Sequence, residues 1–560
     1  MRVMTAGKYI HISISIAVLF ICSAFHLAYA SEALDRAYKA GTITSETYVV
    51  QKLKSYFTPE RVNPALQRMF PSPNRKPTRN MTHLLKYARL HFDSFSEESQ
   101  AYIKQYFARP TDQNNEDFNG YWYLPDPISY WVPPEVDYPQ IGEKFKFWYV
   151  DHDTPDAEGY VHTTTLDYVK SVARVLDTVY NVEISSMGYQ EPPDDSNKDD
   201  NGGDGKYDVY IMDCGAVGLY GYVDPPGKAD PSATTGDEAN SYYSFMVLDN
   251  DYSSTDFPNS DPNEALKVTA AHEYHHAIQF GINVDSSPWY MEATSTWMED
   301  QVYDEINDNR QYLTDFFNSP EVSLDYEGDD YHYYGTWIWN EFLETKWGQS
   351  TIKLIWDELD PYGSNRAIDA ITTVLIPKGS TLESAFTEFV AMNYAKTGFY
   401  KDASETGYSE VTIANSGSIH QLDPNSTVSE QITNINHLAS KYYKFVPNST
   451  VTSALTLRIT VDGEDSKNVS AVAISKSKNN SFQEYYFSLN STTKQGRVDI
   501  SDFSYATTSE VVLALVNYSM TSLNNNLEIK YSAALRQSFP EEESDVEEEA
   551  TGCFIMSTYF

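Results

Sequence analysis

The chain has 560 residues and a formal net charge of −40, with 80 Asp and Glu residues against 40 Lys and Arg residues. Such an excess of negative charge repels phosphate groups, which argues against a nucleic-acid-binding protein and against attachment to an anionic membrane surface. Hydrophobic residues make up 41% of the chain and aromatic residues 14%, which is enough for several folded domains and excludes a wholly disordered protein.

The first 30 residues have the pattern of a secretory signal peptide. Arg2 and Lys8 precede an apolar run over residues 9–25, and the Ala-Tyr-Ala sequence at 28–30 is typical of a cleavage site. The apolar run is short for a membrane span, and no later stretch approaches 18 apolar residues. We therefore expect a secreted or extracellular protein without a stable membrane span after signal cleavage.

Residues 31–115 form a basic N-terminal segment. Between residues 31 and 110, 13 Lys and Arg residues face 7 Asp and Glu residues, a net charge of +6 ahead of an acidic body. Helical patterns over 33–40 and 82–92 are separated by the Pro-rich stretch 71–78. Two interpretations stay open, a propeptide held in part by charge and a helical domain that remains attached.

The remaining chain is predicted to be an α+β catalytic domain followed by an all-β sandwich. Residues 116–414 mix aromatic-rich strands with helices, whereas residues 415–538 contain short alternating runs separated by Ser, Asn and Gly turns. Residues 539–560 form an acidic linker and a C-terminal Cys-Phe-Ile tail. The expected strands of the α+β domain are 144–150, 208–212 and 242–248, and its expected helices are 165–180, 262–280, 288–303 and 335–345.

The sequence from His272 to His276 matches the pattern H-E-x-x-H. Residues four apart lie on one face of a helix, so both imidazoles reach one zinc ion and Glu273 lies beside them to act on a water. The helix itself is well supported, because Asp261 is a suitable N-cap ahead of a proline and an apolar run, and Gly281 is expected to end it.

A second helix offers the third ligand that a catalytic zinc needs. Glu292 lies 16 residues after His276, and Glu299 on the same helix face is a second candidate. A third histidine ten residues after the first is absent, because that position is Ile282. The residues therefore favour His-His-Glu ligation of Zn²⁺.

The stretch from Val268 to Phe280, followed by Trp289-Tyr290-Met291-Glu292-Ala293, resembles the active-site region of the gluzincin metallopeptidases. Within that group it is most similar to secreted metalloproteases of myxobacteria and related bacteria. The resemblance implies a zincin-like domain, zinc on His272, His276 and Glu292, and Glu273 as general base for the hydrolysis of a protein or peptide substrate.

Four residues after the glutamate ligand, thermolysin-like members have an aspartate that orients a histidine. This sequence has Thr296 there, so we expect Glu299 or Asp300 to take over that role.

The transition state needs a further hydrogen-bond donor beside the metal. Relatives use a Tyr or His in the corresponding chain region, where this sequence offers Tyr334, Tyr333 and His332. By the same analogy, the strand 242–248 is expected to be the sheet edge that pairs with an extended substrate.

An acidic loop suggests a calcium site. Asn197, Asp199, Asn201 and Asp208 fall at positions 1, 3, 5 and 12 of a calcium-binding loop, although position 1 is ordinarily Asp and position 12 Glu. A bound Ca²⁺ is expected to stabilise the fold and to take no part in catalysis; the alternative is a solvated acidic turn.

The sequence therefore predicts a secreted zinc metallopeptidase, an endopeptidase that hydrolyses peptide bonds. The main alternative is a secreted or surface binding protein with a structural or vestigial metal site and a partner-binding sandwich. A zinc hydrolase of a non-peptide amide or ester also stays open, because H-E-x-x-H specifies an activated water and not a substrate. The sequence predicts no oligomeric state.

Overall fold

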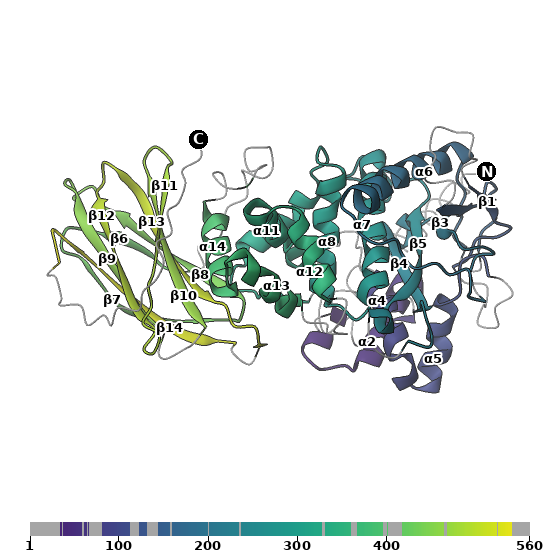
Figure 1. Ribbon diagram of the computed structural model, residues 1–560, viewed down its shortest axis with the longest axis horizontal. Helices are drawn as coiled ribbons and strands as arrows, with labels where there is room; N and C mark the ends of the chain where they lie inside the picture. Colours follow the sequence, from purple (N-terminus) through teal and green to yellow (C-terminus); the bar gives the residue numbers. More distant parts are fainter. Residues whose placement is uncertain are drawn as a thin grey trace, which may run out of the picture. The chain divides into compact units, whose positions relative to one another are not determined.

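The computed structural model describes residues 34–35, 37–58, 61–63, 65, 81–112, 122–131, 144–156, 159–199, 201–233, 237–327, 331–359, 367–395, 400, 417–463, 468–522 and 525–539. The predicted signal peptide, and the acidic linker and tail beyond residue 539, lie outside the described residues. The chain divides into two compact units, Met1–Ala414 and Asn415–Phe560. The fold is mixed α+β, as the sequence predicts (Figure 1).

A five-stranded sheet is the centre of the first unit, with strand order β1-β2-β3-β5-β4. Strands β2, β3 and β5 run parallel to one another, and β1 and β4 lie antiparallel at the two edges. The strands are β1 (Ile128–Tyr130), β2 (Phe145–Tyr149), β3 (Tyr207–Met212), β4 (Gly221–Lys228) and β5 (Tyr242–Asp249).

This order corrects the prediction for the strand 242–248. That strand is β5, which lies between β3 and β4, so its backbone is paired on both sides. The open edge beside it is β4, whose pairing with β5 shifts register between Asp224 and Gly227. The intervening Pro225-Pro226 explains why β4 is an edge, because proline lacks the N–H that an inner strand needs.

Helices cover both faces of the sheet. The helices of the first unit are α2 (Ser45–Phe57), α4 (Met81–His91), α5 (Glu97–Ile103), α6 (Leu166–Tyr180), α7 (Pro262–Asn283), α8 (Pro288–Val302), α9 (Leu313–Asn318), α10 (Tyr331–Gly335), α11 (Ile338–Trp347), α12 (Ser350–Leu359), α13 (Ala367–Leu375) and α14 (Leu382–Tyr394). Side chains of α2, α4 and α5 share one buried core with Tyr210 and Met212 of β3 and with Phe245 and Val247 of β5. Alternate residues of a strand point to opposite faces, so Val209 and Met246 face away from this core, on the side where α7 packs against β5.

The basic N-terminal segment is therefore built into the first unit. Its helices α2 and α5, purple to blue in Figure 1, belong to the same compact unit as the teal helices α7 and α8. Arg89 of α4 pairs with the buried Asp224 of β4, and Arg109 pairs with Asp195 and Asp208, so opposite charges meet where the basic segment contacts the acidic body.

The second unit consists of two mostly antiparallel sheets that enclose one apolar core. Their strand orders are β11-β10-β13-β8-β6 and β12-β9-β14-β7. The strands are β6 (Ile419–Leu422), β7 (Thr427–Ile435), β8 (Ala439–Pro447), β9 (Leu455–Asp462), β10 (Val469–Ser477), β11 (Phe482–Tyr486), β12 (Gln495–Phe503), β13 (Thr508–Asn517) and β14 (Leu527–Arg536). Both sheets contribute to the core, for example through Phe445 and Leu513 from one and Leu457 and Leu535 from the other, which is a sandwich-like arrangement.

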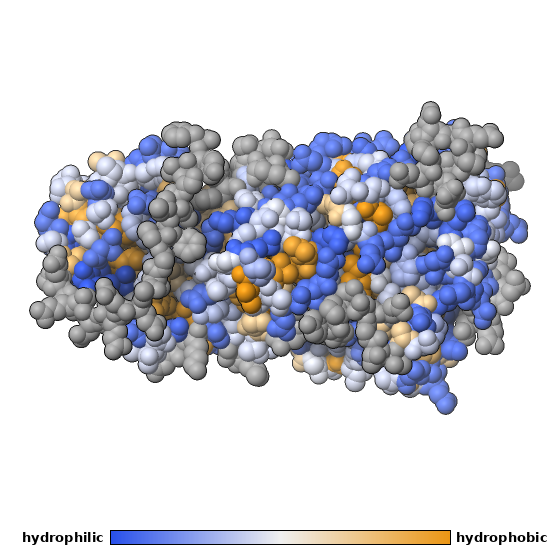
Figure 2. All heavy atoms as spheres, in the orientation of Figure 1, coloured by the Kyte–Doolittle hydropathy of each residue, from blue (hydrophilic) through white to orange (hydrophobic). Residues whose placement is uncertain are grey.

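No helix in the described part of the chain is both long enough and apolar enough to cross a membrane. In the face drawn in Figure 2 hydrophilic residues predominate, and hydrophobic residues form smaller separate areas.

Candidate metal centre

Helix α7 carries both motif histidines, and its sequence explains where it begins. The Asp261 side chain accepts hydrogen bonds from the backbone N–H groups of Asn263 and Glu264, and Pro262 occupies the first turn. Such an N-cap stabilises a helix by about 1 kcal/mol. The predicted end at Gly281 is wrong, because α7 continues to Asn283.

Gly281 instead allows a close contact. A Cβ atom at this position would lie 2.7 Å from Cδ of Pro193, so α7 and the 190s loop can pack together only over a glycine.

The three predicted zinc ligands meet in one fully buried place. The Nε2 atoms of His272 and His276 are 3.1 Å apart. Oε2 of Glu292, on α8, lies 3.0 Å from Nε2 of His272, and its Oε1 lies 3.6 Å from Nε2 of His276. Ligands at 2.0–2.1 Å from a tetrahedral zinc lie about 3.3 Å from one another, so these spacings fit one ion.

The other ring nitrogens are held by α7 and α8. Nδ1 of His272 donates to Oε1 of Glu299 at 2.8 Å, and Nδ1 of His276 donates to Oε1 of Gln279 at 2.7 Å. With Nδ1 protonated, each neutral imidazole directs its Nε2 lone pair toward the other and toward the Glu292 carboxylate. Buried lone pairs and negative charge that converge in this way favour a cation between them, and the residues fit a bound zinc ion.

These contacts separate the two candidate third ligands. Glu292 faces the Nε2 atoms, whereas Glu299 orients His272 from behind. Of the two residues expected to orient a histidine, Glu299 contacts His272. The sequence could not single it out, because Glu292 and Glu299 share one helix face.

The opposite charges of the histidines and glutamates in the centre shift the pKa values of His272 and Glu292. Burial acts to lower the pKa of His272, but Glu292 and Glu299 outweigh it and raise that pKa to about 9. Burial acts to raise the pKa of Glu292, but His272 and His276 outweigh it and hold that pKa well below its usual range. Positive charge is thus favoured between these residues, as a metal ion would supply it.

Glu273 lies beside the ligands on α7 and is fully buried. Its Oε2 accepts a hydrogen bond of 3.2 Å from the hydroxyl of Thr82, which belongs to the N-terminal helix α4. The same hydroxyl accepts a hydrogen bond of 3.0 Å from the backbone N–H of Val223 on the edge strand β4.

His83, next to Thr82 on α4, also reaches the centre. Its Nε2 lies 2.8 Å from Oε1 of Glu292. In the described part of the chain, the ligand atoms of His83, His276 and Glu292 form a group of three that all lie within 4.8 Å of one another. The sequence analysis missed His83 and Thr82, because only folding brings α4 to helices some 190 residues further on.

The three candidate donors lie on α10 and point in different directions. The Tyr334 ring is 6.4 Å from the His272 ring, and the Tyr333 ring is 6.3 Å from the His83 ring, measured between centroids. His332 packs on Phe316 with 5.0 Å between ring centroids. Tyr334 and Tyr333 therefore border the centre, and His332 faces the aromatic core of α9.

Another buried pair next to the ligands was not predicted. Nδ1 of His275 lies 2.8 Å from Oε2 of Glu183, and both side chains are fully buried. Glu183 follows α6 in a short π-helical turn, so no sequence motif links it to α7. The pair ties α6 to the helix that carries the ligands.

Two of the predicted calcium-binding residues have other partners in the structure. Asn201 accepts from the backbone of Gly203, and the buried Asp208 accepts from Trp148 Nε1 at 2.7 Å and pairs with Arg109. The positive partner that the structure gives Asp208 is thus Arg109. Asp199 belongs to no group of three His, Cys, Asp or Glu ligands in the described part of the chain, and the calcium site stays a prediction.

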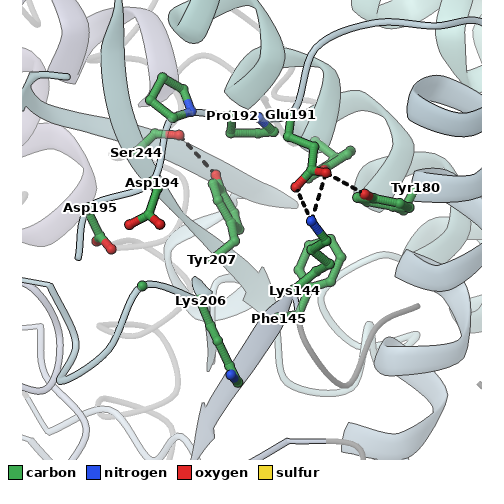
Figure 3. A pocket seen from close by; sticks show the side chains of 13 residues that line it. Lys144, Phe145, Tyr180, Glu191, Pro192, Asp194, Asp195, Lys206, Tyr207 and Ser244 are labelled. Carbon is green, nitrogen blue, oxygen red and sulfur yellow. Dashed lines mark hydrogen bonds and ion pairs between the residues drawn. The ribbon is translucent and has the colours of Figure 1, made fainter. Parts of the chain in front are cut away.

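A pocket lies beside this loop (Figure 3). Lys144 pairs with Glu191 at 2.7 Å on one side, and the carboxylates of Asp194 and Asp195 lie on the other. Tyr207 contacts Ser244 at 3.1 Å between them. The pocket therefore presents both signs of charge and no group of metal ligands among its described residues.

Residues 258–451 match the profile of a family of unknown function, DUF6055. The match begins just ahead of α7 and includes α8, so all three predicted ligands and Glu273 fall within it. The basic N-terminal segment, with Thr82 and His83, lies outside it. No curated protein matches the chain.

Proposed function

We propose that the chain is a secreted, zinc-dependent metallopeptidase of the gluzincin type, with a zincin-like domain, that hydrolyses peptide bonds within proteins. The observation that carries the proposal is the convergence of the Nε2 atoms of His272 and His276 on the Glu292 carboxylate, with Glu273 beside them. Export is proposed from the signal-peptide pattern of residues 1–30.

Each side chain has a role in this proposal. His272, His276 and Glu292 hold the metal, and Glu299 and Gln279 fix the two imidazoles so that Nε2 points to it. A bound zinc ion would supply Lewis-acid polarisation of the scissile carbonyl and acidify a water. Glu273 takes the proton of that water and delivers it to the leaving amine.

Two further groups act on the substrate. Tyr334, beside His272, is the favoured donor to the oxyanion because His332 faces Phe316 instead. The edge strand β4 is the surface on which an extended peptide adds as a further strand, in place of β5.

A second candidate function rests on His83. Four protein ligands and no open position are typical of a structural zinc site, which is the binding-protein alternative. Glu273 argues for the enzyme, because a structural site has no need of a buried carboxylate beside its ligands.

The test is metal content together with hydrolysis. We expect about one zinc per wild-type chain and a sharp loss of zinc in His272→Ala and Glu292→Ala. Glu273→Gln should retain zinc and lose at least about 100-fold in casein hydrolysis relative to the wild type assayed under the same conditions. Zinc binding without hydrolysis in any form of the protein would support the structural site, and absence of zinc from the folded wild type would refute the proposal.

A further inference from the structure

Helix α4 brings a fourth candidate ligand to the centre. His83 is 7% exposed, and its Nε2 lies 2.8 Å from Oε1 of Glu292. Its ring also lies edge-on to the ring of His276, with 5.5 Å between centroids. The ligand atoms of His83, His276 and Glu292 all lie within 4.8 Å of one another, so His83 is close enough to these two residues to share an ion with them.

The residue before it engages the rest of the machinery. The Thr82 hydroxyl donates to Oε2 of Glu273 and accepts from the N–H of Val223. Glu273 is the proposed general base, and Val223 lies on the edge strand that an extended substrate would pair with. One hydroxyl group thus holds both the base and the substrate-binding edge.

Two basic side chains fix α4 in this place. Nζ of the buried Lys86 donates to the backbone oxygen of Ser286 at 2.9 Å. Arg89 donates to Oδ2 of the buried Asp224, on β4, at 2.6 Å. Thr82, Lys86 and Arg89 are spaced by four and three residues, so they lie on one face of α4, the face that contacts the sheet edge and α7.

We propose that α4 holds the enzyme in a latent state, with His83 as a fourth ligand of the catalytic metal and Thr82 in place of substrate on Glu273 and Val223. This inference rests on the proposed function. It favours the propeptide interpretation of the basic segment, because hydrolysis requires α4 to leave. His83, the first of the two histidines of α4, thereby acquires a role in regulation.

Cobalt substitution tests the ligand directly. The full chain, with residues 31–115 retained, is loaded with Co²⁺ and its visible absorption spectrum is recorded with and without acetohydroxamate, a small chelating probe for an open metal position. In the wild type we expect a four-coordinate spectrum that acetohydroxamate leaves unchanged. In His83→Ala the spectrum should differ and should shift when acetohydroxamate is added.

A matched control lies on the same helix. His91 is exposed and stacks on Tyr87 with 4.0 Å between ring centroids, so His91→Ala should behave as the wild type does. Casein hydrolysis should rise at least about tenfold in His83→Ala, because the closed state loses the contact of His83 with the metal, and it should not rise in His91→Ala. A tenfold change in the closed-to-open equilibrium corresponds to about 1.4 kcal/mol.

Thr82→Val gives a second variant of nearly the same shape. It should raise hydrolysis while leaving the cobalt spectrum in its four-coordinate form, because it removes the hydroxyl and not the ligand. If His83→Ala fails to fold, Thr82→Val and the wild-type spectrum still test whether α4 closes the metal site. A wild-type cobalt spectrum that responds to acetohydroxamate would overturn the inference and leave the metallopeptidase proposal standing. A chain that takes up no cobalt would refute both.

Discussion

His272 and Glu299 lie on successive helices, and their side chains meet with 2.8 Å between Nδ1 and Oε1. Both are fully buried. Because the carboxylate can only accept here, the contact fixes the proton on Nδ1 and leaves Nε2 to face Glu292. In the proposed metallopeptidase, Glu299 would therefore take the orienting role expected near Thr296, from one helical turn further along α8.

Replacing Glu299 by Gln should weaken the metal site without removing a ligand. The amide can present its N–H₂ group to the imidazole and favour the wrong tautomer of His272, so zinc affinity should fall about 10- to 100-fold. Competition with a chromophoric chelator measures this affinity. Glu305→Gln is the control, because Glu305 is 68% exposed and its partner Lys267 is 3.4 Å away. Equal affinities in the two variants would contradict the role assigned to Glu299.

The ion pair between Arg89 and Asp224 should stabilise the packing of α4 on the sheet. Arg89→Met retains much of the apolar stem but leaves Asp224 buried without its cation, which should lower the free energy of unfolding by about 3 kcal/mol. Arg89→Met combined with Asp224→Asn should recover most of that loss, because no charge then remains buried. Urea denaturation of the three proteins checks this. A double variant as unstable as the single one would show that the charge of Asp224 is not the cause.

Much of the candidate metal centre could be predicted because its candidate ligands lie in two adjacent helices. The spacing of His272 and His276, the N-cap at Asp261 and the position of Glu292 are local patterns, and the structure brings these three ligands together. Glu292 and Glu299 share a helix face, so only the folded packing separates the ligand from the residue that orients His272.

Long-range pairing could not be predicted in the same way. The sequence identifies β5 as a strand. Its inner position in the sheet depends on β4, which precedes it in the chain and pairs along its outer side. Pro225-Pro226 was the available signal for an edge at β4. The contact of Thr82 with Glu273 joins residues 191 positions apart, and no period or motif connects them. In the second unit, β7 is mostly exposed and gives a weak alternating pattern, whereas β9 alternates clearly along its length.

Gly281→Ala should destabilise the protein although it replaces glycine inside a helix. In an open helix the change would stabilise by about 0.5–1 kcal/mol. Here the added Cβ would lie 2.7 Å from Cδ of Pro193, and such overpacking costs about 1–3 kcal/mol. Thermal unfolding should show a lower midpoint for Gly281→Ala and a recovery when Pro193→Ala is added. A raised midpoint in the single variant would mean that the 190s loop moves aside at little cost.

Asp249, at the end of β5, should make stability fall with rising pH. Burial raises the pKa of this carboxyl to about 7, against hydrogen bonds from the backbone N–H groups of Gly215, Asp251 and Tyr252 that act to lower it. The folded state therefore retains a proton that the unfolded state loses near pH 4.

The contribution of Asp249 is fully present below about pH 4 and is lost as pH rises toward 7, by up to a few kcal/mol. Asp249→Asn removes this titration, so its stability relative to wild type should increase between pH 4 and pH 7. Urea denaturation across that range measures the difference. Asp251→Asn is the control, because Asp251 is exposed and accepts its hydrogen bond from Ser253. Parallel curves for wild type and Asp249→Asn would mean that the three backbone donors outweigh burial and keep Asp249 ionised.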